Sequence, residues 1–442
     1  MSQKAGTLKI GLGDTIITPR ENLQLRGFAR SQMATGTHDD LHVRSLVVED
    51  SAGKSVCIMS LSIVYLDREL VERIRREINE KTGIPENAIL LSCTHTHAGP
   101  FVEEAPDSYR EFLVTQSVKS VTDAWESRFP GRLGIDSTEV MELGRNRRRL
   151  LYGGVHPDPQ VALIKIEDLD GELKGVLFNY GCHPSSLDWQ NRLYSEDWPY
   201  YSIKGLEEKL GADVRLSYLQ SAQGDINTGY SSELSAVGVD MPVRTYWYIE
   251  IKGKQMTDAV DAALPDIQTV DSLTVDAATA RYDFPLRKSF PVTLEEAAKN
   301  ADAADIKLAA MEAKSELQGT RTLDYVRFEH FSAHQRHTFA KKFYSEDFPE
   351  TENIELQAIR IGDAVFFSLP GEVFSEIALA VKKQSPYEKT YAAGVTNGFY
   401  GYMPRAADFI EGDYEVDGCK YSPDAEAFMI ESSLDVISRL TN

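Results

Sequence analysis

Short apolar runs that end at glycine, proline or polar residues recur along the chain, and each predicts a buried strand. The run from Ser55 to Val64 is nearly continuous in its hydrophobicity, which is typical of a strand buried on both faces. Leu356 to Ile361 and Ala364 to Leu369 flank Gly362-Asp363 and predict a hairpin. The other predicted strands are Leu8 to Gly13, Val43 to Val48, Ile89 to Cys93, Val161 to Ile166, Gly175 to Tyr180, Arg215 to Leu219, Ser272 to Tyr282 and Thr390 to Val395.

Stretches with helical periodicity separate these runs. Asp67 is the predicted N-cap of one helix, whose apolar residues recur from Leu70 to Ile78 and which ends at Gly83. Strand, helix and strand follow one another over 55–93 and again over 175–219, so two βαβ units with parallel strands are expected. We therefore predict the α/β class, with mixed, largely parallel β-sheets flanked by helices. Further helices are predicted at Tyr109 to Arg128, Tyr201 to Leu210, Tyr246 to Ala263, directly after Glu372, and at Ala425 to Leu440.

The region from Thr293 to Phe343 differs from the rest of the chain because it is almost wholly helical in pattern. Thr293 and Glu296 form a capping box, and the alanines, glutamates and lysines that follow favour a helix. We interpret 290–345 as a helical insertion within a single domain that spans 1–442.

Two histidines in this insertion, His330 and His334, are four residues apart on a predicted helix. This spacing suits a metal ion, although the glutamate of an HExxH motif is missing. The alternative is an arm that contacts substrate at the mouth of a pocket through Arg327, His334 or Arg336.

Composition and charge exclude several classes of protein. The chain has 442 residues, of which 42% are hydrophobic, and a net charge of −21, which repels phosphate backbones and argues against nucleic-acid binding. It contains no apolar stretch long enough to cross a membrane and no apolar segment near Met1. Unless a signal peptide has been removed, a soluble cytoplasmic protein is expected. The four cysteines have no CxxC spacing and are expected to be reduced: Cys57, Cys93, Cys182 and Cys419.

Candidate chemistry begins where the strand Ile89 to Cys93 ends, because His95 and His97 follow it one residue apart. Side chains two apart on an extended chain point the same way, so both imidazoles are expected to face one cavity. The carboxyl ends of parallel strands are also where α/β proteins bind ligands. The pair suits a metal ligand with a neighbouring acid or base, or an ordinary pair of hydrogen-bonded histidines.

Other predicted strands also end in polar residues. His183, Asp225 and Glu372 each follow an apolar run, and Tyr400 and Tyr402 lie in a glycine-rich turn after another. Two imidazoles and a carboxylate with an open position form a catalytic zinc site, in which the pKa of a bound water falls to about 7. Asp225 is expected to orient a ligand histidine.

Several short motifs occur in a fixed order: His38-Asp39-Asp40-Leu41, Thr94-His95-Thr96-His97-Ala98-Gly99-Pro100, Asn146-Arg147, Asp158-Pro159, Gly181-Cys182-His183-Pro184, Ser195-Glu196-Asp197-Trp198-Pro199, Gly224-Asp225-Ile226-Asn227, Leu369-Pro370-Gly371-Glu372 and Gly401-Tyr402. In this order the chain resembles the catalytic domain of the neutral/alkaline non-lysosomal ceramidases. The resemblance covers most of the chain outside the predicted insertion. It is specific for the superfamily and not for the substrate.

The resemblance implies hydrolysis of an N-acyl amide by a zinc-activated water, with the metal also polarising the carbonyl. It implies that His97 and Arg147 steady the scissile carbonyl or its oxyanion. Tyr400 and Arg327 are taken as candidates for substrate binding. The implied zinc ligands are His95, His183, Glu372 and Tyr402, the last chosen over Tyr400.

Two departures from the family pattern bear on the substrate. Asn227, followed by Thr228, stands at the catalytic position where ceramidases carry a serine, so the hydroxyl is absent or displaced. Longer members carry a secretion signal and an immunoglobulin-like C-terminal domain, and the chain ends at Asn442 with neither. We therefore expect a cytoplasmic zinc hydrolase of a small soluble substrate, with a true ceramidase as an alternative. The oligomeric state, including a homo-oligomer, stays open.

Two further functions also stay open. A glycoside or ester hydrolase on the same scaffold would use a pair of carboxylates about 5 Å or about 6.5 to 9.5 Å apart. The candidates for such a pair are Asp225, Glu372, Asp197 and Glu196. A metal-stabilised binding protein without turnover would have a closed site with four ligands.

Overall fold

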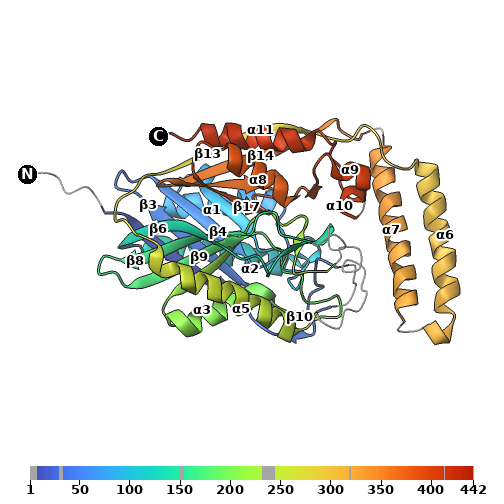
Figure 1. Cartoon of the computed structure of the whole chain (residues 1–442), viewed down its shortest axis with the longest axis horizontal. Coiled ribbons are helices and arrows are strands. Elements are labelled where there is room, and N and C mark those ends of the chain that lie inside the picture. Colours follow the sequence, from blue (N-terminus) through green and yellow to red (C-terminus); the bar gives the residue numbers. More distant parts are fainter. Residues whose placement is uncertain are drawn as a thin grey trace, which may run out of the picture.

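The computed structural model describes residues 7–28, 33–148, 154–230, 244–317, 320–345, 347–412 and 414–441 (Figure 1). Its largest sheet runs in the order β11 (Arg215–Gln220), β9 (Leu173–Tyr180), β8 (Gln160–Asp168), β6 (Phe129–Glu139), β1 (Lys9–Ile16), β3 (His42–Glu49), β4 (Ser55–Leu61) and β5 (Ile89–Cys93). A second sheet runs in the order β13 (Val275–Pro285), β14 (Thr351–Ile361), β15 (Ala364–Leu369) and β17 (Lys389–Gly394).

Short strand pairs and helices complete the described part of the chain. The pairs are β10 (Leu193–Tyr194) with β2 (Gly36–Thr37), β12 (Ile226–Asn227) with β7 (Arg145–Asn146), and β16 (Glu372–Val373) with β18 (Tyr402–Met403). The helices are α1 (Arg68–Thr82), α2 (Asp107–Glu126), α3 (Trp198–Leu210), α5 (Tyr246–Ala263), α6 (Leu294–Glu312), α7 (Arg321–Phe343), α8 (Ser375–Gln384), α9 (Asp408–Glu411), α10 (Tyr414–Asp417) and α11 (Ala425–Ser438). Single 3₁₀ turns occur at Glu86–Ala88, Val102–Glu104, Leu264–Asp266 and Ser315–Leu317.

The predicted α/β class with mixed sheets and flanking helices is confirmed, but the sheets are not largely parallel. In the large sheet, five of the seven pairings between described strands are antiparallel. The parallel pairings are β4 with β5 and β9 with β11, which are the two predicted βαβ units, crossed by α1 and α3. In the smaller sheet, β15 and β17 pair in parallel across α8. Parallel neighbours need such a crossover, and most other connections have none.

The strand β6 was missed because its sequence begins Phe129-Pro130-Gly131 and contains a second glycine, and both residue types weaken strand propensity. It forms because β8 pairs with it from Gly131 to Glu139. Helix boundaries follow the sequence more closely. The Asp67 carboxylate accepts a hydrogen bond from Leu70 N at 2.8 Å, and Gly83 ends α1 in the left-handed conformation.

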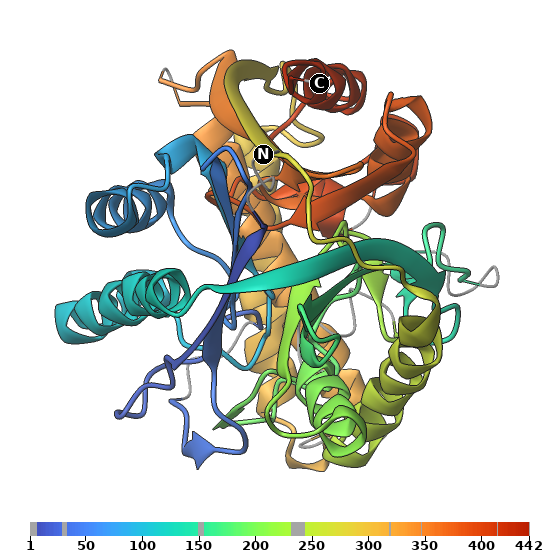
Figure 2. The ribbon, with the colours of Figure 1, turned by 90° about the vertical axis from the view of Figure 1, so that its left-hand side faces the viewer.

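Helices cover both faces of the large sheet. Figure 2 shows α1 and α2 on one side and α3 and α5 on the other, while α8 and α11 cover the smaller sheet. The two sheets meet at the last residues of β5 and just after β17, where Ser92 and Thr396 form an isolated bridge. There the Ser92 hydroxyl donates to Gly394 O at 2.7 Å. The carboxyl ends of strands that are far apart in sequence therefore converge.

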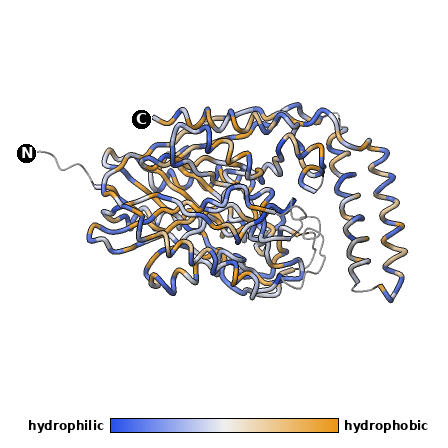
Figure 3. The backbone as a smooth tube through the Cα atoms, viewed as in Figure 1, coloured by the Kyte–Doolittle hydropathy of each residue, from blue (hydrophilic) through white to orange (hydrophobic). Residues whose placement is uncertain are grey.

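The helices α6 and α7 stand side by side at one end of the molecule, beyond α9 and α10 (Figure 1). They confirm the helical pattern predicted for Thr293 to Phe343, with a break between them, and the capping box of Thr293 and Glu296 is present. Hydrophilic and hydrophobic positions alternate along both helices, whereas the strands of the body are mostly hydrophobic (Figure 3). The division of 1–442 into one domain with an insertion stays a prediction.

The four cysteines are buried and none forms a disulfide, as expected for reduced thiols. Burial raises the pKa of the Cys419 thiol to about 11 and that of the other three still further. Within the part of the chain that the structure describes, every helix is too short or too polar to cross a bilayer.

Candidate active site

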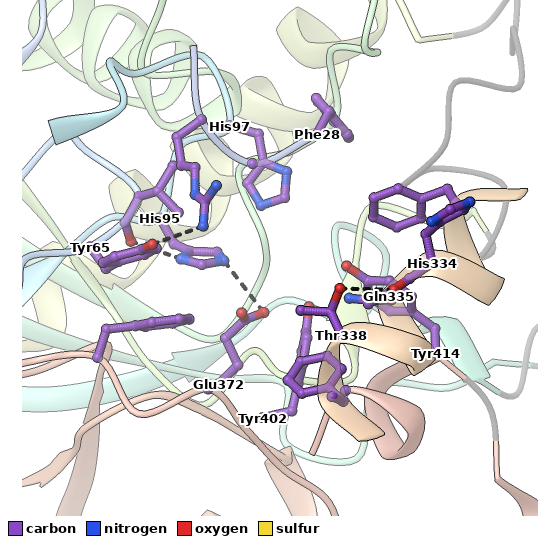
Figure 4. A pocket seen from close by; sticks show the side chains of 18 residues that line it. Phe28, Tyr65, His95, His97, His334, Gln335, Thr338, Glu372, Tyr402 and Tyr414 are labelled. Atoms are coloured by element: carbon purple, nitrogen blue, oxygen red, sulfur yellow. Dashed lines mark hydrogen bonds and ion pairs between the residues drawn. The ribbon is translucent and has the colours of Figure 1, made fainter. Parts of the chain in front are cut away.

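A cavity of about 580 Å³ opens where the two sheets meet (Figure 4). His95, His97 and Glu372 point into it from one side, and side chains of α7 face them from the other. Tyr402 and Tyr414 complete the side nearest to the short helices. The lining residues that α7 contributes are Phe331, His334, Gln335, Thr338 and Phe339.

His95 reaches this cavity through an unusual backbone conformation. Its φ of 69° is left-handed, which is costly for a residue with a Cβ and is typical of functional sites. Hydrogen bonds from Thr94 N to Leu61 O and from His95 N to Ile63 O hold the turn. The prediction that His95 and His97 face one cavity is confirmed, but the backbone at His95 is left-handed and not extended.

The tautomers of two histidines follow from their backbone partners. His95 Nδ1 lies 2.8 Å from Val64 O, and His183 Nδ1 lies 2.9 Å from Ile226 O. A carbonyl oxygen only accepts, so each Nδ1 carries the proton and each Nε2 presents a lone pair. Burial and the Arg147 guanidinium lower the pKa of His183 to about 4, which keeps this imidazole neutral.

Both lone pairs converge on Glu372. Its Oε2 lies 3.0 Å from His183 Nε2 and 3.4 Å from His95 Nε2. The Arg147 guanidinium approaches one of these donors, with Nη1 3.5 Å from His183 Nε2, and three electron-pair donors that face one another in a buried space suit a cation between them. The donor set of two imidazoles and a carboxylate fits zinc, and backbone carbonyls that fix the far ring nitrogens are the usual support of such ligands.

Tyr402 lies next to Glu372 because the two residues are register partners in the parallel pair of β16 and β18. Its hydroxyl accepts a hydrogen bond from Arg147 Nη2 at 3.0 Å, and burial together with the Glu372 charge raises its pKa well above 10. Tyr400 does not line the cavity. Its carbonyl accepts from the Tyr421 hydroxyl at 3.0 Å, and its ring faces Lys420.

Arg147 is buried behind the cavity and does not line it. Its Nε donates to Glu415 Oε1 at 2.7 Å, and its Nη2 donates to Gly224 O at 2.8 Å as well as to Tyr402. Its pKa stays well above the usual value because Tyr402 and Glu415 outweigh the cost of burial. Arg147 therefore links Tyr402 to the buried carboxylate of Glu415.

His97 stands at the wall of the cavity, with its ring centroid 5.1 Å from that of His95 and 5.7 Å from that of His183. Ring nitrogens of the three histidines lie within 4.8 Å of one another. The ring packs edge-on against Phe28 at 4.8 Å and directly against Gly27. A Cβ at Gly27 would overlap the His97 ring, and the φ of 107° at this residue also favours glycine.

Asp225 is buried near these residues but contacts neither imidazole. Its carboxylate accepts from Asn146 Nδ2 at 2.7 Å and from the Ser375 backbone N–H at 2.8 Å. Burial raises its pKa to about 6 against these hydrogen bonds. The carbonyl of the next residue, Ile226, and not the Asp225 carboxylate, orients His183.

The sequence of the chain matches a known protein family. The family model described as neutral/alkaline non-lysosomal ceramidase, N-terminal, matches residues 8–231, just over half of the chain. The chain belongs to this ceramidase family.

Individual relatives of the chain agree with this assignment. A neutral ceramidase of Pseudomonas aeruginosa is 26% identical over 219 residues, which are 43% of this chain and 32% of that protein. Neutral ceramidase 1 of Arabidopsis thaliana is 26% identical over 217 residues, which are 42% of this chain and 27% of that protein. The match therefore spans about a third of these relatives or less. The crystal structure of the Pseudomonas aeruginosa enzyme superposes with a TM-score of 0.76 and 19% identity, over 98% of this chain and 74% of that chain, so the fold is shared.

Two residues singled out from the sequence lie away from the cavity of this ceramidase-family chain. Asn227 closes a local turn, with its Nδ2 donating to Tyr230 O at 2.7 Å and its Oδ1 accepting from Gly229 N at 2.8 Å. Arg327 lies on α7, and its Nη2 contacts Glu312 Oε1 on α6 at 3.0 Å. Neither lines the cavity.

The sequence did not single out the aromatic part of this ceramidase-family site. Tyr65 and Phe399 stack with their centroids 4.0 Å apart, and Arg26 donates to the Tyr65 hydroxyl at 2.9 Å. All three line the cavity. The only indication in the sequence is that these residues lie in loops directly after apolar runs or within turns.

Proposed function

We propose that the chain is a zinc-dependent hydrolase that cleaves the amide bond of an N-acyl substrate. The observation that carries the proposal is the convergence of the Nε2 lone pairs of His95 and His183 on the carboxylate of Glu372. Family membership supports amide hydrolysis as the reaction class. Zinc would be held by these three side chains and Tyr402, where it would supply Lewis acidity and a bound water with a pKa of about 7.

The residues of the chain have separate roles in this proposal. Backbone carbonyls fix both imidazoles, so their nitrogen lone pairs are already oriented before substrate arrives. His97 lines the cavity beside them, and we assign it the donation of an N–H to the oxygen of the scissile carbonyl as negative charge develops there. Arg147 acts at a distance because its hydrogen bond to the Tyr402 hydroxyl positions that residue.

The lining of the cavity favours an apolar acyl group. Phe28, Tyr65 and Phe399 stand on the body side, and Phe331 and Phe339 stand on α7. A volume of about 580 Å³ falls within the range of pockets for small molecules, which is roughly 300 to 1,000 Å³. We propose a small N-acyl substrate with an apolar acyl chain, and the cytoplasmic location stays a prediction.

The carboxylate-pair chemistry of a glycoside hydrolase has no support in the geometry. Of its four candidate residues, Glu372 alone lines the cavity. Glu196 pairs with Arg44 at 2.6 Å, and Asp197 accepts from Trp198 N at 2.7 Å at the start of α3. These carboxylates hold the fold together.

The experiment that tests the proposal combines metal analysis with a substrate series. The purified chain is assayed on N-acyl amides of increasing acyl length and on an aryl glycoside, before and after chelation, with readdition of zinc. We expect cleavage of the amides to stop on chelation, to return with zinc and to favour apolar acyl groups. Amide cleavage that is indifferent to chelation would overturn the zinc proposal, and glycoside cleavage alone would overturn the reaction class. Bound metal without turnover would indicate a binding protein.

A further inference from the structure

A second group of metal-binding side chains lies on the helical pair α6 and α7. Asp305 comes from α6, and His330 and His334 come from α7. His330 Nε2 lies 2.7 Å from Asp305 Oδ1, and His334 Nε2 lies 2.9 Å from the same oxygen. Among the described residues, this cluster and the three histidines of the cavity are the groups whose donor atoms all lie within 4.8 Å of one another.

The two helices impose this arrangement. Residues four apart share one face of a helix, so His330 and His334 stand one above the other, with ring centroids 4.4 Å apart. The neighbouring helix brings Asp305 opposite both rings. An ion with bonds of about 2.0 to 2.2 Å separates adjacent ligand atoms by roughly 2.9 to 3.5 Å. The two oxygen–nitrogen distances of 2.7 and 2.9 Å lie at or just below this spacing, and all three donor atoms lie within 4.8 Å of one another.

Other contacts between the helices are ordinary ion pairs. Arg327 contacts Glu312, and Lys307 contacts Glu329, and no single carboxylate oxygen there is shared by two imidazoles. A lysine or arginine has no lone pair to give, whereas a neutral histidine does. His330 and His334 need only shift their protons from Nε2 to Nδ1 to free both lone pairs, so binding an ion releases no proton from neutral imidazoles.

We propose that Asp305, His330 and His334 form a second divalent-metal site, distinct from the cluster of His95, His183 and Glu372. Two imidazoles and one carboxylate favour a borderline ion such as Zn²⁺, Ni²⁺ or Co²⁺. The side chains of Asp305, His330 and His334 are 52%, 31% and 42% exposed. Water therefore completes the coordination, and the ion exchanges with solvent.

The position of the site gives the ion a consequence for the cavity. His334 also lines the cavity, together with Phe331 and Thr338 on the same helix. An ion held between α6 and α7 cross-links the two helices, and so it restrains the wall of the cavity that faces Glu372.

The test is zinc binding by the whole chain. Zinc content is measured after equilibration with Zn²⁺ for the wild type and for His330→Ala and Asp305→Asn, with His337→Ala as the matched control one turn further along α7. We expect about two zinc ions per chain for the wild type and the control, and about one for each of the two variants. Equal zinc content in all four proteins would overturn the proposal.

A second experiment starts from the variant His183→Ala, so that binding on α6 and α7 is measured apart from the candidate active site. In His183→Ala, the zinc that remains is titrated calorimetrically with and without His330→Ala. Loss of binding only in the double variant, with an unchanged circular dichroism spectrum, supports an independent site on α6 and α7. Retention of that zinc in the double variant would assign it elsewhere and overturn the proposal, whatever the fate of the proposed amide hydrolysis.

Discussion

The two histidine clusters of this protein use the same donor types on different supports. At the cavity wall, Glu372 is nearly buried, His183 behind it is fully buried, and backbone carbonyls fix the ring nitrogens that point away from the site. On α6 and α7, Asp305, His330 and His334 are each at least 31% exposed, and helical spacing alone brings the rings together.

The two clusters differ in burial, and burial is what an active site has in addition to the ligands of a metal site. Burial makes an unpaired lone pair costly, so a cation bound at the cavity cluster would be held away from bulk water. The exposed cluster is hydrated, so a metal bound there would exchange, and its donor atoms also form ordinary hydrogen bonds. The first arrangement suits catalysis and the second suits a reversible structural link. The predictions below test this contrast, from the largest expected effect to the smallest.

Removing a ligand from the buried cluster has the largest effect. For His183→Ala we expect loss of the cavity metal and a fall in kcat/KM greater than the roughly 10- to 100-fold typical of residues that only support a ligand. Zinc analysis and steady-state kinetics on an N-acyl amide measure both. Unchanged metal content would remove His183 from the ligand set and, with it, the contrast between the clusters.

Breaking the buried ion pair behind the cavity mainly affects stability. Arg147→Met removes one of the two guanidinium partners of buried Glu415, because Arg148 Nη1 stays 2.9 Å from Glu415 Oε2. We expect a cost of about 1.5–3 kcal/mol, below that of a buried carboxylate left without any partner. The matched control is Arg439→Met, which breaks the exposed pair with Asp435 and is expected to change stability little. Denaturant unfolding compares the two variants. An equally small change in both would show that burial does not set the strength of the Arg147 pair.

Displacing His97 without touching a polar group has an intermediate effect. Gly27→Ala places a Cβ against the His97 ring, so we expect kcat/KM to fall about tenfold, or roughly 1.4 kcal/mol, with zinc content retained. Gly53→Ala is the control, because Gly53 also has a positive φ but nothing within 4 Å of the added carbon. Equal activity in the two variants would separate His97 from the reaction.

The smallest effect is expected at the wall formed by α7. Phe331→Ala removes an aromatic ring from the wall of the cavity. We therefore expect KM for a long-chain N-acyl amide to rise a few-fold while kcat changes little. Ile306→Ala on α6 is the control, because this side chain is 73% exposed. A KM that depends on acyl length in the same way for both variants would show that α7 takes no part in substrate binding.

Local elements of the fold were predictable because neighbours in sequence decide them. The caps of α1, the hairpin at Gly362 and the capping box at Thr293 were all found from short motifs, and all three are present. The parallel pairs β4 with β5 and β9 with β11 were also predictable, since each encloses its own crossover helix. Among the antiparallel pairs, β3 with β4 and β8 with β9 are joined by short turns and are local, whereas β1 pairs with β6 over a long separation in sequence that no local pattern reveals.

The candidate site also has features that the sequence predicted and features that only the tertiary structure decided. The sequence by itself determined which polar residues follow apolar strands, and the resemblance to the ceramidases singled out His95, His183, Glu372 and Tyr402 among them. The tertiary structure decided that a left-handed turn aims His95, that register beside Glu372 selects Tyr402 over Tyr400, and that Glu415 anchors Arg147. It also turned Asn227 and Arg327 away from the cavity. Residue type and local pattern define what a side chain is able to do, but packing between distant segments fixes where it points and whether water reaches it.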